Sequence, residues 1–591
     1  MVMRRSLPAL FLHSVHDFPR DDLFLVRQKG GKWDPVSSRT ALEVVREIAA
    51  GLLADGIEPG QRVGILSENR YEWVLTDVAT HFCRCADVPV YPSLPANQAR
   101  FILHDAGARF VVVSTATQAA KVASVRAELP QLEKVYCMDG AASGAEDFAE
   151  LRARGRAYLE AHPGALEDNL VSVEPDELAT LIYTSGTTGM PKGVMLTHAN
   201  FCSNVAEAGE AFNFEPGEIA ISFLPLSHVL ERMVTYLFLD RGLGIAHVRR
   251  IERVADALQE VRPHVFVTVP RLLERAFAAV NNQVDSRSGL GGVFARNALK
   301  WGLKGADKRL MGKKPRGPGF RLADKAIFSK IREKMGGRLR FVIAGGAALP
   351  EVPARFFWAA GIGVYEGYGL TETSPVIAVN QPGRVKVGTV GPVINGVELR
   401  LAEDGEIITR GPNVMRGYWG RREDTEEVLH GEWFYTGDLG KLDDEGFLSI
   451  TGRKKEIIVL STGKNIGPRT IEAEIEKSRF MNCVVAVGDD KPSIGLLILP
   501  NYERLAEWAR GKNLEFTKPE DLLDLPETRQ LFEAEINLHQ TRLAAYEKVK
   551  KFAFLEEELS EDNGLLTPTQ KVRRREVNRV YKDAIDAMYQ R

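Results

Sequence analysis

The sequence predicts an α/β protein with a large N-terminal body of parallel-rich sheets and helices, followed by a smaller α+β C-terminal domain. Short β-branched runs recur through the first two thirds of the chain, at 62–67, 109–115, 264–270 and 340–346. Helix-period stretches separate many of these runs, as ALEVVREIAAGLLADG does at 41–56. This alternation is typical of parallel sheets whose strands are joined by helices.

The sequence pattern changes near residue 383 and indicates a small β subdomain at about 383–450. The stretch 388–411 contains several short strands with Asn-Gly and Asp-Gly turns and leaves no room for helices. A second break falls in ITGRKKEIIV, where a glycine and a run of charges follow a strand. Because 591 residues are too many for one ordinary core, we place the main domain boundary there. The predicted domains are 1–451 and 457–591.

The composition argues against several functional classes. The formal net charge is -2, with 44% hydrophobic and 26% charged residues, so no global field attracts nucleic acid. Five scattered cysteines, an odd number, fit free thiols in a reducing compartment better than a disulfide framework. No window approaches the apolar length of a membrane span. We therefore predict a cytoplasmic protein.

The segment 295–340 departs from the rest of the chain because it is rich in Lys and Arg and poor in Asp and Glu. Phe294, Ala298 and Trp301 are spaced as one face of a helix, with lysines beside them. Such a helix can lie on anionic lipid, which permits peripheral contact with the inner face of the membrane. A solvated charged face is the commoner structure for this pattern, and both interpretations stay open.

The stretch YTSGTTGMPKGV, at 183–194, follows an apolar strand and is dense in hydrogen-bond donors. Glycines let the backbone approach a ligand closely, hydroxyls donate hydrogen bonds, and the lysine adds a point charge. The common target of such donors is an anion with many acceptor oxygens, and a polyphosphate fits best. The alternative is a Ser/Thr/Gly surface turn. The donor residues are Thr184, Ser185, Gly186, Thr187, Thr188, Gly189 and Lys192.

This loop resembles the signature of the AMP-forming acyl-CoA synthetases and related adenylate-forming enzymes. Six further motifs, in the family's order, extend the resemblance over nearly the whole chain and together are far beyond chance. The chain length, PLSHVLER, the basic segment and the C-terminal motif are most similar to the long-chain fatty acyl-CoA synthetase branch. The six motifs are FLPLSHVLER (223–232), AGGAAL (344–349), YEGYGLTETSP (365–375), YTGDLG (435–440), TGRKKEIIVLSTGKNIGP (451–468) and LTPTQKVRR (566–574).

The resemblance implies an ATP-dependent, AMP-forming long-chain fatty acid–CoA ligase. Such an enzyme joins the acid to AMP with release of pyrophosphate and then transfers the acyl group to CoA, with Mg²⁺ as cofactor. One alternative is a fatty acyl-AMP ligase that loads a carrier protein, in which the basic segment is the insertion that restrains domain rotation. A second alternative is a non-catalytic nucleotide-binding protein, against which intact Lys192, Glu372 and Lys571 argue.

For the N-terminal domain, the resemblance assigns the β- and γ-phosphates of ATP to the loop from Thr184 to Lys192. It places Tyr368 against adenine, Thr371 as a donor to the α-phosphate, and Glu372 as an oxygen ligand of Mg²⁺. His228 is expected to orient the fatty acid, because a carboxylate nucleophile needs no general base at neutral pH. The remaining ATP- and AMP-binding positions are Gly345, Gly346, Ala347, Glu366, Gly367 and Gly369.

The resemblance also assigns residues near and beyond the domain boundary. Asp438 is expected to accept from the ribose hydroxyls, with Arg453 supporting the same sugar. Lys571 is expected to reach from a mobile terminal domain to the α-phosphate during adenylation. Rotation of that domain between the two steps implies a hinge at 452–456 that contains Lys455. Gly463 then leaves a passage for CoA because it has no side chain.

Overall fold

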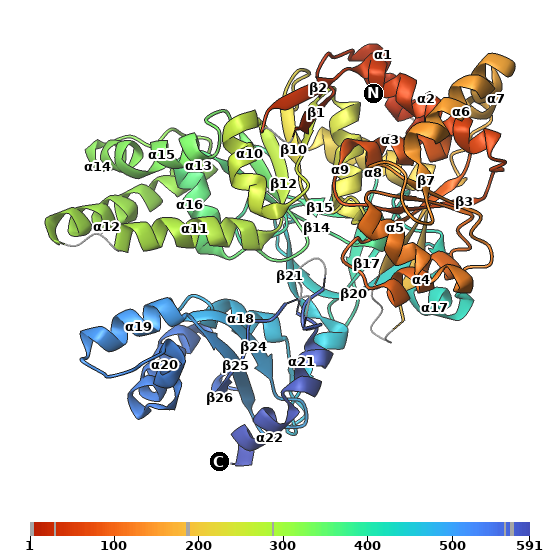
Figure 1. The fold of residues 1–591 in the computed structure, drawn as a ribbon. Helices are drawn as coiled ribbons and strands as arrows, with labels where there is room; N and C mark the ends of the chain where they lie inside the picture. The colour runs from red at the N-terminus through yellow and green to blue at the C-terminus, as the bar shows by residue number, and fades with distance from the viewer. Residues whose placement is uncertain are drawn as a thin grey trace. The chain divides into compact units, whose positions relative to one another are not determined.

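The computed structural model describes residues 5–28, 31–184, 190–285, 289–560, 563–567 and 572–590. The chain divides into two compact units, drawn as one ribbon in Figure 1. The α/β class predicted from the sequence is confirmed. The N-terminal unit comprises Met1–Arg400, Ile408–Thr436 and Leu442–Ser449, and the C-terminal unit comprises Leu401–Ile407, Gly437–Lys441 and Ile450–Arg591.

Sheet A of the N-terminal unit has eight strands, of which the inner ones are parallel and the two edge strands antiparallel. The β-branched runs predicted at 264–270 and 340–346 form two of its buried inner strands, because both faces of the sheet are covered. In spatial order the strands are β15 (Val376–Val379), β14 (Gly363–Gly369), β13 (Phe341–Ala344), β12 (Val265–Thr268), β10 (Ile219–Ser222), β11 (Gly244–His247), β1 (Phe24–Arg27) and β2 (Trp33–Val36).

Sheet B of the same unit also has eight strands. Along its strand β5, Phe110 and Val112 pack into the large core. Val111 and Val113 pack on the opposite face against apolar residues of α4 (Ala96–Asp105) and α5 (Ala116–Ala123). This alternation follows from the two-residue period of a strand. In spatial order the strands are β18 (Gly417–Tyr418), β9 (Lys192–Thr197), β8 (Leu178–Thr184), β4 (Ala86–Val90), β3 (Arg62–Leu66), β5 (Phe110–Val113), β6 (Lys134–Cys137) and β7 (Glu146–Asp147).

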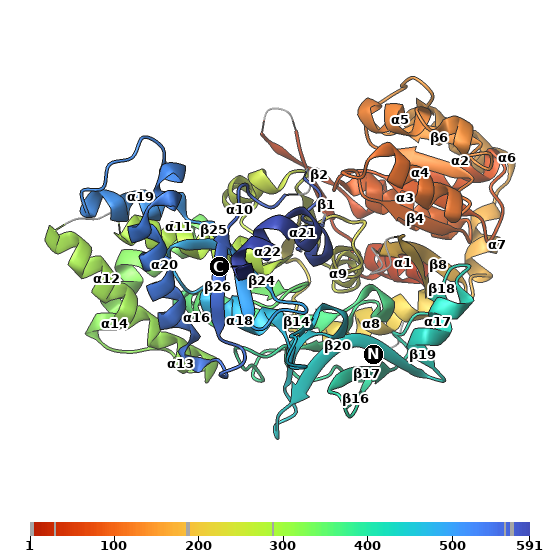
Figure 2. The ribbon, with the colours of Figure 1, turned by 90° about the horizontal axis from the view of Figure 1, so that it is seen from below.

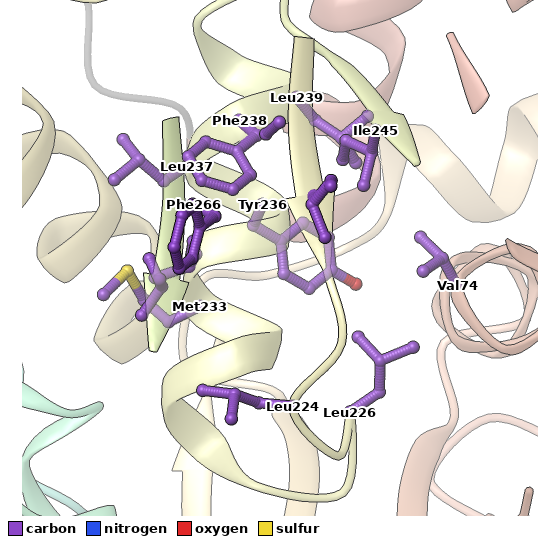
Figure 3. Packing of buried hydrophobic residues seen from close by; sticks show 14 of the residues in the cluster. Val74, Leu224, Leu226, Met233, Tyr236, Leu237, Phe238, Leu239, Ile245 and Phe266 are labelled. Carbon is purple, nitrogen blue, oxygen red and sulfur yellow. The ribbon is translucent and has the colours of Figure 1, made fainter. Parts of the chain in front are cut away.

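A layer of helices packs between the two sheets. Helix α9 (Val229–Asp240) contacts β10 and β11 of sheet A, while α3 (Tyr71–Phe82) and α8 (His198–Glu210) contact strands of sheet B. Helices α8 and α9 also contact each other, and α1 (Leu7–Asp17) contacts all three. Figure 3 shows the apolar packing of this layer, with Val74, Tyr236 and Phe266 in one buried cluster. The layer therefore joins the two sheets into one core.

The other helices of the N-terminal unit cover the outer faces of the sheets or connect their strands. The helix predicted at 41–56 is confirmed as α2, which packs against α3 and α6. These helices are α2 (Ser38–Ala54), α4 (Ala96–Asp105), α5 (Ala116–Ala123), α6 (Phe148–Ala161), α7 (Ala165–Val171), α10 (Val254–Val261), α11 (Pro270–Asp285), α15 (Ser329–Lys334), α16 (Glu351–Ala360) and α17 (Arg422–Val428).

The basic segment forms several short helices. Helix α12 (Gly289–Leu303) ends before α13 (Gly305–Leu310) begins. Ala298 is fully buried, whereas 45% of Trp301 is exposed. The predicted single apolar face is therefore divided between the core and the surface.

Helix α12 packs against α14 (Pro318–Ala323), and Figure 2 shows the two helices side by side. The contact is close, because a Cβ at Gly302 of α12 would lie 3.2 Å from the Cβ of Ala323 in α14. Helix α13 also approaches α14, because a Cβ at Gly305 of α13 would lie 2.5 Å from the ring of Phe320 in α14. In the described ranges, no helix combines the length and the apolar composition that crossing a bilayer requires.

A five-stranded sheet is formed by strands that lie between Glu398 and Arg453. Its strand β20 runs through the YTGDLG motif. The spatial order is β16 (Glu398–Leu401), β17 (Glu406–Arg410), β20 (Trp433–Leu442) and β19 (Leu429–His430), with β21 (Leu448–Arg453) paired to β20.

The C-terminal unit contains a separate hydrophobic core around a three-stranded sheet. Helix α18 is followed along the chain by strands β24 and β25. The unit's strands are β22 (Ile458–Val459), β23 (Asn465–Ile466), β24 (Met481–Val487), β25 (Ile494–Pro500) and β26 (Val549–Phe554). Its helices are α18 (Pro468–Ile475), α19 (Tyr502–Gly511), α20 (Pro526–His539), α21 (Arg574–Val580) and α22 (Lys582–Gln590).

Candidate functional site

Neighbouring parallel strands of sheet A lead into segments that contain residues predicted from the sequence. The segment after β10 contains His228, the segment after β13 begins at Gly345, and β14 contains Glu366 and leads to Glu372. These strands and β12 are adjacent, in the order β14, β13, β12, β10. The carboxyl ends of parallel strands meet at the same edge of a sheet, which is where open α/β sheets bind ligands. Motifs far apart in the sequence therefore meet at one edge of sheet A.

His228 begins the helix that follows β10. Its Nδ1 accepts a hydrogen bond from the backbone N–H of Leu230 at 3.2 Å, so the ring caps the N-terminus of α9. When the ring is neutral, this acceptor role places its proton on Nε2. His228 therefore has a structural function in addition to the role expected from the sequence, and the cap fixes the orientation of its ring.

The Gly-Gly-Ala segment leaves β13 at the same edge. The backbone N–H of Gly345 donates to the carbonyl of Thr268 at 3.0 Å. A Cβ at Gly345 would lie 2.9 Å from Leu230, so a side chain would press on α9. Gly346 adopts a φ of +85°, which favours glycine, and both Gly346 and Ala347 are exposed. The segment is thus a wall of backbone with little side-chain bulk.

Strand β14 places Glu366, Gly367, Tyr368 and Gly369 in succession. Glu366 is 6% exposed, and its carboxylate accepts the backbone N–H of Leu349 at 3.2 Å. Burial raises the pKa of Glu366 to about 7, although backbone N–H donation to the carboxylate opposes the rise. Through its hydrogen bond with Leu349, Glu366 connects β14 to the segment that follows β13.

Gly367 and Gly369 occupy positions with little room, and Tyr368 between them is half-buried. A Cβ at Gly369 would lie 1.7 Å from the carbonyl oxygen of Pro375, so every other residue type is excluded without a backbone shift. At Gly367 the nearest atom, on Val379, would be 3.3 Å away. The glycine at 369 is therefore required by the return of the chain into β15.

The donor-rich loop joins two strands of sheet B. Strands β8 and β9 are antiparallel, and Thr184 lies opposite Lys192 in their register. The loop residues Ser185, Gly186, Thr187, Thr188 and Gly189 lie outside the described residues. The described part of the hairpin thus brings the first and the last of the predicted phosphate-binding residues together.

Lys192 is held between two side chains from a distant part of the sequence. Its Nζ lies 2.5 Å from Oδ1 of Asp424 in α17. The same ammonium lies 5.2 Å from the ring centroid of Tyr418, within the range of a cation–π contact. The Lys192 side chain is 15% exposed and that of Asp424 is 27% exposed. Both charges therefore border on solvent.

Glu372 lies in the short 3₁₀ turn Thr371–Thr373 and is half-buried with Thr371. Its Oε1 accepts the hydroxyl of Tyr418 at 2.9 Å, and its backbone carbonyl accepts the N–H of Met415 at 2.8 Å. Among the described residues, none donates a hydrogen bond to Oε2 of Glu372. This carboxylate has the type of oxygen that Mg²⁺ prefers, so it fits the predicted metal ligand.

Asp438 and Arg453, which were predicted to hold one sugar, lie close together. Nε of Arg453 donates to Oδ1 of Asp438 at 2.8 Å. Asp438 is 6% exposed, whereas the side chain of Arg453 is 46% exposed. The guanidinium fixes the carboxylate in one orientation.

Lys455 is exposed in the 3₁₀ turn Lys454–Glu456, directly after β21. Gly463 lies in the turn between β22 and β23, where its φ of +77° favours glycine and a Cβ would meet no atom within 4 Å. Local backbone geometry therefore gives a second reason for glycine at this position. Lys571 lies outside the described residues.

A buried charge cluster joins the helical layer to strand β4 of sheet B. Asp77, His81 and Asp87 could hold a metal ion by their spacing alone. Arg232 already supplies the cation, since its Nη2 lies 2.6 Å from Asp77 and 2.7 Å from Asp87. Tyr236 donates to Asp77 at 2.7 Å. The cluster links α9 to α3 and β4, and we interpret it as structural.

Sequence reasoning missed Arg232, Tyr418 and Asp424. Arg232 stands in the motif FLPLSHVLER and was not distinguished from its neighbours there. Asp424 is 232 residues from its partner Lys192, so no local spacing could reveal the pair. Tyr418 lies in a Gly-Tyr-Trp stretch between two recognised motifs, and an aromatic in an apolar context is usually a core residue.

Two family models match this chain. The model of the AMP-binding enzymes matches residues 11–419, and the model of the AMP-binding enzyme C-terminal domain matches residues 455–591. A long-chain-fatty-acid–CoA ligase of Mycobacterium bovis is 34% identical over 607 aligned positions, covering 99% of each chain. The peroxisomal long chain acyl-CoA synthetase 7 of Arabidopsis thaliana is 30% identical, covering 98% of this chain and 85% of its own.

Solved structures share the fold at low sequence identity. The adenylation domain of a carboxylate reductase from Mycobacterium chelonae superposes with a TM-score of 0.76 and 19% identity, covering 99% of this chain and 91% of its own. An anthranilate CoA ligase in complex with anthranoyl-AMP superposes with a TM-score of 0.72 and 17% identity, covering 99% of both chains.

Proposed function

The chain belongs to the AMP-binding enzymes, and on that premise we propose that it activates a long-chain fatty acid with ATP and transfers the acyl group to CoA. The observation that carries the proposal is the arrangement around Tyr418. The ring of Tyr418 lies under the Lys192 ammonium, and its hydroxyl bonds the Glu372 carboxylate. Tyr418 thus contacts both a lysine suited to phosphate and a carboxylate suited to Mg²⁺, which are two kinds of group that ATP sites use. The relatives named long-chain ligases support the same substrate class.

In the first step, a carboxylate oxygen of the fatty acid attacks the α-phosphorus of ATP and pyrophosphate leaves. Both reactants are anions, so the site must neutralise charge and hold geometry more than it must move protons. Lys192, Thr184 and the intervening loop are assigned to the β- and γ-phosphates. When bound, Mg²⁺ neutralises phosphate charge, and Glu372 would hold it. Thr371 donates to the α-phosphate in this assignment.

The other predicted residues are assigned to the remaining parts of the ligands. Tyr368 lies against adenine beside the backbone wall at Gly345, Gly346 and Ala347, while Glu366, Gly367 and Gly369 shape the strand end. His228 orients the fatty acid carboxylate, and its capping bond keeps the ring in place. Asp438, oriented by Arg453, accepts the ribose hydroxyls, and Lys571 approaches the α-phosphate.

In the second step, the thiol of CoA attacks the acyl carbonyl, and AMP leaves with its phosphate oxygen. We assign the chain to domains 1–451 and 457–591, with rotation at the hinge 452–456 that contains Lys455. Gly463 provides the passage for CoA in this arrangement. The alternatives are transfer of the acyl group to a carrier protein and nucleotide binding without catalysis.

Pyrophosphate exchange into ATP separates these functions. We expect fatty-acid-dependent exchange with purified protein and Mg²⁺, followed by thioester and AMP when CoA is added. Lys571→Ala should abolish exchange while largely sparing ATP binding. Exchange without thioester would indicate an acyl-AMP ligase, and the absence of exchange with every acid tested would favour a binding protein. Exchange at the parent rate by Lys571→Ala would contradict the role of Lys571.

We also place the protein in the cytoplasm, with peripheral contact to the inner membrane face through the basic segment. Residues 295–340 contain 15 Lys and Arg against 3 Asp and Glu. Pro318, Arg321, Leu322 and Lys325 are exposed at helical spacing and border an open hollow of about 560 Å³. Basic and apolar groups on one face suit an anionic bilayer. Co-sedimentation with anionic against zwitterionic phospholipid vesicles tests the contact, which equal binding to both would contradict.

A further inference from the structure

Tyr418 lies in a short segment that links the phosphate loop to the Glu372 turn. Strand β18 pairs antiparallel with β9, with Tyr418 opposite Val194 in the register. The N–H of Trp419 donates to the carbonyl of Gly193 at 2.8 Å, directly after Lys192. Three residues before Tyr418, the N–H of Met415 donates to the carbonyl of Glu372 at 2.8 Å. The backbone of this segment is therefore bonded to both parts of the site.

The side chain of Tyr418 also contacts both parts of the site, Glu372 and Lys192. Its residue exposure is 8%, so the ring is held in a nearly closed environment. Its hydroxyl donates to Oε1 of Glu372 at 2.9 Å, and among the described residues no group donates to Oε2, so that oxygen can face a ligand.

The ring face of Tyr418 supports the cation. The Lys192 ammonium lies 5.2 Å from the ring centroid, and Asp424 holds it there at 2.5 Å. The tyrosine is itself fixed, because its backbone N–H donates to Oγ1 of Thr425 at 2.9 Å. One side chain thus contacts the cation with its ring and the anion with its hydroxyl.

We propose that Tyr418 is a positioning residue that holds the Glu372 carboxylate ready for Mg²⁺ and the Lys192 ammonium ready for phosphate. The proposal rests on the ATP-dependent function inferred above. A hydrogen bond to a ligating carboxylate fixes its orientation, and loss of such a bond typically lowers metal affinity 10- to 100-fold. The hydroxyl and the ring have separable effects, because the first contacts only the anion and the second lies under the cation.

The experiment measures ATP binding by isothermal titration calorimetry, in EDTA and across a Mg²⁺ series. Tyr418→Phe keeps the ring and removes the hydroxyl. We expect its ATP affinity in EDTA to stay within about twofold of the parent, while the Mg²⁺ concentration that gives half of the Mg²⁺-dependent gain rises about 10-fold. Tyr418→Leu also removes the ring, and we expect ATP binding in EDTA to weaken about fivefold as well.

The matched control is Tyr136→Phe in sheet B. Tyr136 donates its hydroxyl to Asp55 at 2.7 Å, so the control removes the same kind of bond elsewhere in the unit. We expect its Mg²⁺ series to match the parent. A Mg²⁺ half-point within twofold of the parent in Tyr418→Phe would overturn the proposal. So would equal weakening of ATP binding by Tyr418→Phe with and without Mg²⁺, because that result indicates a general structural role.

The same measurements distinguish this inference from the proposed function. A parent protein that binds Mg²⁺ and ATP and exchanges pyrophosphate, with an unaffected Tyr418→Phe variant, contradicts only the role of Tyr418. A parent protein that binds no ATP under any Mg²⁺ concentration contradicts the ATP-dependent function, and the role of Tyr418 with it.

Discussion

Two ion clusters of the N-terminal unit have the same kinds of groups and opposite surroundings. Arg232 lies between Asp77 and Asp87, and all three side chains are at most 1% exposed. Lys192 and Asp424 form a single pair that is 15% and 27% exposed. If Arg232 turned toward a ligand, it would leave the buried Asp77 and Asp87 without a counter-ion. Lys192 can turn toward a ligand at lower cost, because its partner Asp424 borders on solvent. Burial therefore separates a cation enclosed in the core from one that solvent, and so a ligand, can reach.

Removing the buried cation should have the largest effect. Arg232→Met leaves Asp77 and Asp87 buried without a counter-ion, and we expect the free energy of unfolding to fall by about 3–5 kcal/mol. Urea denaturation of the purified variant measures this. The control Arg253→Met removes an ion pair with Asp256 that is about half exposed on both sides, and it should cost less than about 1 kcal/mol. Equal losses in both variants would contradict the comparison.

Glu231 extends the comparison of the two ion clusters to a buried carboxylate that has no cationic partner among its described neighbours. Glu231 precedes Arg232 and is 2% exposed, and burial raises its pKa to about 8 although Ser222 and the backbone of Phe223 donate to it. The folded state then keeps a proton that the unfolded state loses above its pKa of 4.5. The stability from this protonation is fully present below pH 4.5 and is lost as the pH rises through about 8.

The test substitutes Glu231→Gln, an uncharged residue of similar size. Between pH 5 and pH 8, the parent should lose about 3 kcal/mol of unfolding free energy that the variant keeps. Urea denaturation across this pH range measures the difference between the two proteins. A constant difference with pH would mean that Glu231 titrates normally in the folded protein.

Removing the partly exposed cation, Lys192, should change activity more than stability. We expect Lys192→Ala to lower fatty-acid-dependent pyrophosphate exchange about 100-fold, as loss of a group that stabilises developing charge does. Its unfolding free energy should change by less than about 1 kcal/mol, because the pair with Asp424 borders on solvent. Lys32→Ala, at a lysine whose side chain is 83% exposed, is the control and should leave exchange unchanged. A Lys192→Ala variant with parental exchange would remove Lys192 from the phosphate site.

Local pattern was sufficient for the fold class and for most elements. The runs at 62–67 and 109–115 form β3 and β5, and the helix at 41–56 forms α2, because apolar periodicity and chain propensity act over short distances. The burial of residues in the basic segment could not be predicted from local pattern, since Ala298 and Trp301 share a predicted helix face but differ in exposure. Helix α12 contacts α11, α14 and α16, so which of its residues are buried depends on residues outside the helix.

The sequence by itself determined the α/β class, the membership in the AMP-binding enzymes and the chemical type of each motif, because donor groups, carboxylates and glycines are properties of residue types. Only the tertiary structure decided which charges meet. It paired Lys192 with Asp424 across 232 residues, set Tyr418 between Lys192 and Glu372, and buried Arg232 in a cluster of acids. The physical reason is that ion pairs and hydrogen bonds depend on distances of a few ångströms, which long-range strand pairing and helix packing create.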